Sequence, residues 1–404
     1  MAKRNEIIWG IILGLFIFNM VLEDILPITN VFDECIALLC IPLACIDFLK
    51  HKKQGHGKMN ATKRMQFVLL FLFLGLGLLS NALHQYQPLW VVLVSAVLST
   101  KFFMILITAG YLWKMFPIDL EKQENMTCTL SIIWFVYTVV SAVFSNVLAC
   151  PQAWDICAKA SLLFALLVFC EHSKVWLSRI CILLMLILLL FSGKEKSYGA
   201  ILVFVVLYYL VVHKKVQTKL RYILYMAVPV TVLAWDKIYY YYVVGQGRFA
   251  KSVMTSTSFQ IAKDYFPLGT GFGTFGSTYA AKHYSPVYHL YGIAGHPELG
   301  EETRNYLTDQ FWPLLLGENG FLGTIIYIGL IVVLFLQVQR VYYYNKKKYL
   351  LLIYLLVFML MTTFTESGFM QPMVMVYAFV MGLILEEYEE KRNKKLEFFV
   401  REES

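Results

Sequence analysis

The feature that most constrains this chain is a succession of apolar segments, each close to the length of a helix that crosses a bilayer. A hydrocarbon core about 30 Å thick needs roughly 20 apolar residues in a helix, and about twelve such segments occur. Of the 404 residues, 59% are hydrophobic and 15% are charged. Soluble domains carry about 25% charged residues. This pattern excludes a disordered chain, a disulfide scaffold and an ordinary cytosolic enzyme.

The sequence therefore predicts an all-α integral membrane protein with about twelve transmembrane helices, forming a single polytopic domain over residues 1–404. The expected spans are residues 7–22, 32–49, 67–83, 90–112, 130–148, 154–170, 175–191, 198–212, 222–235, 320–338, 349–364 and 369–385. A cleavable signal peptide is not expected, because Glu23 and Asp24 follow the first segment in place of a small-residue cleavage site.

Basic residues are placed on alternate connections between these segments. They fall at residues 3–4, 50–64, 174–179, 214–221, 340–348 and 391–401. With twelve spans all of them lie on one side, which the positive-inside rule assigns to the cytoplasm. We therefore expect both termini in the cytoplasm and the protein in the cell membrane. The net charge of +8 then reflects topology and attraction to membrane lipids, and no nucleic-acid partner is expected.

The longest stretch between spans, residues 236–313, is then a large extracytoplasmic loop between the ninth and tenth spans. Long ordered loops usually carry function. This one contains Gly269, Gly271 and Gly273 within a glycine-rich segment, residues 267–276. Such glycines let backbone amides approach a ligand and form an anion site. Two interpretations stay open: a cradle for the phosphate of a lipid-linked substrate, or a tight turn packed against helix ends.

Four cations are candidates for substrate binding. Arg248, Lys194 and Lys196 lie on the outer side, against the usual bias. Arg248 would bind a phosphate in a bidentate manner, or it is a solvated or paired loop charge. The two lysines would bind an anion or extend to lipid phosphates. Lys101 lies inside an expected span, where a charge is costly, so it lines a substrate cavity, pairs with a carboxylate or marks a break in the helix.

Three outward or near-membrane carboxylates, Asp309, Glu318 and Glu366, are candidates for general-base catalysis on a sugar hydroxyl, and the first two are favoured. Asp309 would alternatively cap the N-terminus of the next span. The three histidines of the outer segment have no compact metal-ligand spacing, so neither a metal nor another cofactor is expected. Cys150 and Cys157 flank a short outer loop and would form a disulfide or pack as thiols in helix ends.

At these residues the chain resembles the O-antigen polymerase and O-antigen ligase superfamily, which includes capsular repeat-unit polymerases of Gram-positive bacteria. The resemblance is carried by residues 271–275 (Gly-Phe-Gly-Thr-Phe), by Arg248 before them and by residues 318–323 (Glu-Asn-Gly-Phe-Leu-Gly). It implies a GT-C-like, metal-independent, inverting glycosyltransferase. Such an enzyme transfers the growing glycan from undecaprenyl diphosphate to a sugar hydroxyl of the next repeat unit, with Arg248 holding the diphosphate.

The resemblance also orders the alternatives. A second family arginine corresponds to the turn at Lys194–Gly199, where lysine supplies charge without the guanidinium fork. Family ligases have a histidine eleven residues before the position of Gly320, and here that residue is Asp309. A polymerase is therefore favoured over a ligase, and a non-enzymatic flippase of lipid-linked oligosaccharides is a third alternative. The expected partners are an undecaprenyl-diphosphate-linked oligosaccharide, membrane lipids, and flippase and chain-length regulator proteins.

Overall fold

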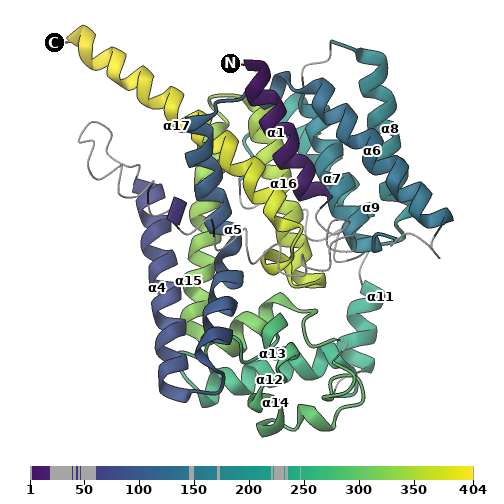
Figure 1. Cartoon of the computed structure of the whole chain (residues 1–404), viewed down its shortest axis with the longest axis vertical. Helices are drawn as coiled ribbons and strands as arrows, with labels where there is room; N and C mark the ends of the chain where they lie inside the picture. Colours follow the sequence, from purple (N-terminus) through teal and green to yellow (C-terminus); the bar gives the residue numbers. More distant parts are fainter. Residues whose placement is uncertain are drawn as a thin grey trace.

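The computed structural model describes residues 2–18, 39, 42–43, 46, 61–144, 150–170, 173–219, 222, 232, 235–245, 247–304 and 306–403. Every regular element in these ranges is helical, and none is a strand. Long helices stand side by side, while α12, α13 and α14 gather at one end of them (Figure 1).

Six helices in the described ranges are long and apolar enough to cross a membrane. They are α4 (Ala61–His84), α5 (Leu89–Met115), α6 (Glu124–Val143), α9 (Glu195–Tyr208) continued by η3 (Tyr209–His213), α15 (Phe311–Val341) and α16 (Lys346–Thr365). The prediction of an all-helical protein with several membrane-crossing helices is confirmed at this level, whereas the prediction of twelve spans is not.

The other expected spans have different outcomes. Helices α1 (Ala2–Ile17), α7 (Ala153–Phe169) and α8 (Val175–Phe191) are shorter, with 16, 17 and 17 residues. Helix α17 (Val374–Glu403) continues past its apolar half into a charged tail. Residues 32–49 and 222–235 lie largely outside the described residues.

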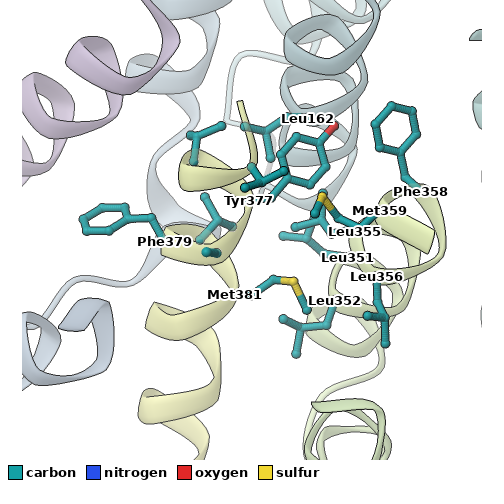
Figure 2. Close-up of a cluster of buried hydrophobic side chains, with 14 of the residues drawn as sticks. Leu162, Leu351, Leu352, Leu355, Leu356, Phe358, Met359, Tyr377, Phe379 and Met381 are labelled. Atoms are coloured by element: carbon teal, nitrogen blue, oxygen red, sulfur yellow. The ribbon is translucent and has the colours of Figure 1, made fainter. Parts of the chain in front are cut away.

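The centre of the helical bundle is α16, which is buried around most of its circumference. A helix that is apolar on all sides belongs in a core, and α16 follows this rule. Figure 2 shows Leu351 and Leu355 of α16 meeting Tyr377 of α17 and Leu162 of α7. The Tyr377 hydroxyl donates to the Ala158 carbonyl at 2.8 Å, so this buried polar group is satisfied.

The start of α1 and the charged end of α17 lie at one end of the bundle, opposite α12–α14 (Figure 1). Near the end of the bundle that carries the termini, Glu386 of α17 forms ion pairs with Lys63 at 3.1 Å and with Lys114 at 2.8 Å. These contacts join α4, α5 and α17. The two ends of the bundle therefore differ. One end carries the termini and many charges, and the other is formed by short helices.

The region between Trp235 and Gln310 is folded, and we call it the short-helix unit. It contains α11 (Trp235–Ile238), η4 (Tyr239–Val244), α12 (Ala250–Asp264), α13 (Thr278–Lys282), α14 (Pro286–Leu290) and η5 (Ile293–Gly295). It has its own core, in which Phe275, Tyr288 and Leu299 are fully buried. Helix α12 packs on α15, so the unit is seated directly on a long helix.

Candidate functional site

The glycine-rich segment, residues 267–276, is held by a kink in α15. Gly320 has φ 60° and ψ −166°, which interrupts the helix and exposes backbone groups of the preceding turn. The Gly317 and Glu318 carbonyls accept from the amides of Thr270 at 3.0 Å and Gly271 at 2.7 Å. A break in a long apolar helix thus supplies the acceptors that a buried irregular segment needs.

The Glu318 side chain completes this attachment. It is fully buried, and its Oε1 accepts from the Thr274 amide at 2.9 Å, the Phe275 amide at 3.1 Å and the Ser277 hydroxyl at 2.6 Å. On the other side, Asn81 of α4 accepts from the Phe272 amide at 2.7 Å. These contacts give Glu318 a positioning function in the described structure.

The three candidate glycines are explained by backbone conformation and close packing. Gly269, Gly271 and Gly273 have φ values of +74°, +92° and +77°, which L side chains rarely adopt. A Cβ on Gly269 would lie 2.5 Å from the Gly320 nitrogen, and one on Gly271 would lie 2.5 Å from the Asn81 Cγ. The geometry therefore matches a tight turn against helices, while direct contact of these glycines with substrate stays a prediction.

A cavity of about 220 Å³ lies beside the end of the glycine-rich segment. Its lining comes from α5, from the start of α15 and from the turn after α16. The residues are Ser95, Leu98, Ser99, Lys101, Gly276, Ser277, Thr278, Tyr279, Thr308, Leu314, Ser367, Met370 and Pro372. Many are hydroxyl-bearing, so the cavity offers both donors and acceptors to a polar ligand.

Lys101 is the cation of this cavity. Its side chain is 1% exposed, and α5 continues unbroken through it. The interpretation of Lys101 as a helix break is therefore wrong, and the structure places it in a cavity wall instead. That the occupant of the cavity is a substrate stays a prediction.

Lys196 is buried and is held in an ion pair with the partly exposed Glu366. Its Nζ lies 2.5 Å from Glu366 Oε1, and Gln371 Nε2 donates to Glu366 Oε2 at 2.8 Å. Glu366 ends α16 directly before Ser367, a residue of the cavity wall. The pair therefore joins α9 to the rim of the cavity. Lys194 is the residue immediately before α9, at the same edge.

Asp309 is half-buried two residues before α15. The N-cap of α15 is Gln310, so the interpretation of Asp309 as a helix cap is wrong. Burial raises the pKa of the Asp309 carboxyl above its usual value; Lys251 and Lys194 act in the opposite direction, and Glu366 adds to the increase. Asp309 thus belongs electrostatically to the same charged cluster as the Lys196–Glu366 pair.

Arg248 lies on the surface, just before α12. Its carbonyl is 2.8 Å from His296 Nε2, which fixes the backbone there. Three residues later, Lys251 donates to the Thr365 carbonyl at 3.3 Å, at the end of α16. Arg248 is not part of the cavity lining, and the structure places it at the end of α12 that approaches the charged cluster.

Two residues of this site, Asn81 and Lys251, were not selected from the sequence, and Glu366 was selected only as a carboxylate, without its partner Lys196. Each acts through a partner that is remote in the chain, and composition and local spacing carry no signal for such pairs. In the described ranges, no three His, Cys, Asp or Glu side chains are grouped closely enough to hold a metal ion. Cys150 is exposed and Cys157 is buried, and both are free thiols, so the disulfide is not formed.

Comparison with known proteins finds no matching family model and no matching curated protein. Function is therefore inferred from the geometry of the residues just described.

Proposed function

We propose that this chain is a membrane glycosyltransferase that polymerises oligosaccharide repeat units carried on undecaprenyl diphosphate. The observation that supports this most directly is the 220 Å³ cavity. Its wall contains Lys101, the hydroxyls that follow the glycine-rich segment, Thr308 beside Asp309, and Ser367 beside Glu366. A buried cation and many hydroxyls in the wall, with carboxylates on the residues next to Thr308 and Ser367, suit a reaction between an anionic lipid carrier and a sugar.

The leaving group determines which charges the reaction needs. As the bond between the anomeric carbon and the phosphate oxygen breaks, the lipid diphosphate gains negative charge. Cations fixed in advance stabilise that charge more in the transition state than in the ground state. We assign this function to Lys101 in the wall, to Lys194 at the rim, and to Arg248 before the end of α12 that contacts α16.

The attacking sugar hydroxyl must lose a proton, and Asp309 is the proposed acceptor. The hydroxyl oxygen bonds to the anomeric carbon from the face opposite the diphosphate, its proton passes to Asp309, and the diphosphate leaves as an anion. A carboxylate whose pKa is raised by burial is a stronger base than an exposed one. Glu318 is then a positioning residue, because its Oε1 is engaged by the glycine-rich segment.

The experiment uses the purified protein and a lipid-linked repeat unit, with and without a chelator. We expect a ladder of products in both samples. Arg248→Ala and Arg248→Lys should each remove the ladder, since lysine lacks the bidentate fork. Lys263→Ala removes an exposed cation from the far end of α12 and serves as the matched control. Wild-type chain growth by a well-folded Arg248→Ala protein would refute the assignment of Arg248.

Two other functions are distinguished from the polymerase by what happens to the lipid-linked oligosaccharide. A ligase of the same superfamily would join a glycan to a different acceptor without lengthening it. A flippase is favoured by one observation, the Asp155–Lys159 pair at 2.7 Å inside α7, because buried charges in membrane helices are common in transporters. Movement of lipid-linked oligosaccharide across liposomes without any new glycosidic bond would support the flippase and exclude the polymerase.

A further inference from the structure

A second concave site lies on the short-helix unit, apart from the cavity. It is an open hollow of about 630 Å³ lined by Gln260, Asp264 and Tyr265 of α12 and its end, and by Leu290 and Tyr291 at the end of α14. It shares no lining residue with the cavity. Its volume falls within the roughly 300–1,000 Å³ typical of small-ligand sites.

The polar groups of the hollow are held in fixed positions. The Tyr291 hydroxyl donates to Asp264 Oδ2 at 2.7 Å. The Tyr265 hydroxyl is 2.5 Å from that of Tyr86, and its ring packs edge-on against His84 at 4.7 Å. Two tyrosine rings and a carboxylate are thereby oriented by contacts within the protein, which lowers the entropy lost when a ligand binds.

The chemistry of this lining selects a class of ligand. Asp264 and Gln260 are exposed and offer carboxylate and amide groups that bond to hydroxyls. Tyrosine rings present flat, amphipathic surfaces on which a sugar ring can stack. None of the five lining residues is basic, which disfavours a phosphate or another anion, and only Leu290 is aliphatic, which disfavours an amphipathic peptide.

The position of the hollow relates it to the proposed reaction. Helix α12 has 15 residues, so its ends are roughly 20 Å apart. Lys251, which contacts the end of α16, is at the first end, and Asp264 is at the other. The hollow and the charged cluster are therefore at opposite ends of α12, a separation that an oligosaccharide, and not a single sugar, would span.

We propose that this hollow binds a glycan strand, and that in the polymerase reaction it retains the growing chain between additions. This inference rests on the proposed function for its place in the reaction, although binding itself does not require catalysis. It predicts that loss of the hollow shortens the product while the first transfer between two repeat units continues.

The test measures binding and chain length separately. The probe is the free repeat-unit oligosaccharide, released from the host's own polysaccharide and carrying neither lipid nor phosphate. Asp264→Ala should weaken its binding by roughly tenfold or more, as expected for loss of a hydrogen bond to a charged group. Tyr291→Phe keeps the ring and removes only the hydroxyl that orients Asp264, so it should give a smaller loss. Ser256→Ala, an exposed change on the same helix, is the control.

Each outcome decides one of the two proposals. Equal binding by the wild type and both hollow variants, or no binding by the wild type at millimolar oligosaccharide, overturns the glycan site even if a ladder is made. Binding that depends on Asp264 without any ladder keeps the glycan site and refutes the polymerase. If Asp264→Ala fails to fold, Tyr291→Phe keeps the test decisive, because it removes a single exposed hydroxyl.

Discussion

Replacing Glu318 by alanine tests the attachment of the glycine-rich segment most directly. The change removes the acceptor of three hydrogen bonds, at 2.9, 3.1 and 2.6 Å, and leaves their donors buried. A buried donor left without a partner costs about 1–3 kcal/mol. Because the donors are neighbours and the segment can relax in part, we expect a total loss on the order of 3–6 kcal/mol.

Glu318→Gln separates hydrogen bonding from charge. The amide oxygen can still accept from Thr274 and Phe275, so the loss should be only about 1–2 kcal/mol. The assay is the unfolding midpoint of the purified protein in detergent, with Glu301→Gln, an exposed change on the short-helix unit, as the control. Proteolysis within residues 267–277 should increase more in Glu318→Ala than in Glu318→Gln. Wild-type stability of Glu318→Ala would refute the reasoning.

Three further predictions concern neighbouring groups. In the same unfolding assay, Gly271→Ala should destabilise the fold by more than about 1 kcal/mol, because φ is +92° and the Cβ would meet Asn81. Gly75→Ala should be neutral or stabilising, because nothing lies within 4 Å of its Cβ. Lys196→Met and Glu366→Gln should each destabilise the fold strongly. In a double-mutant cycle, the double variant should lose less stability than the sum of the two single losses. Polymerisation should fall as pH falls through the raised pKa of Asp309, since the base form is needed. Lys251→Ala removes a cation that lowers this pKa, so the fall should move to higher pH; an unchanged rate–pH profile would contradict this.

The helical class was predictable because apolar length is a local property. Helices α4, α5, α15 and α16 each fall on an expected span, since a run of apolar residues determines both the helix and its burial. The expected span at residues 369–385 illustrates the limit. There the helix begins later and continues through the charged tail, because Glu and Lys are good helix formers and polarity does not end a helix.

The candidate site was predictable only in its residue types. Lys101 was selected because a charge inside an apolar run is costly, and it does line a cavity. The acceptor of the glycine-rich amides could not be deduced, because Glu318 is separated from Thr274 by 44 residues. Lys196 was interpreted as an anion or lipid ligand for the same reason: its carboxylate partner Glu366 is 170 residues away.

The way in which the cavity is built bears on the proposed chemistry. Electrostatic stabilisation of a leaving diphosphate requires cations that do not reorganise during the reaction. Lys101 is fixed by a long helix, and the Lys196–Glu366 pair at 2.5 Å fixes α9 against the rim of the cavity. The irregular part of the wall is in turn fixed by Glu318 on α15 and Asn81 on α4. Loosening Glu318 should therefore slow transfer more than it weakens glycan binding in the hollow, because Ser277, which donates to Glu318, lines the cavity and does not line the hollow.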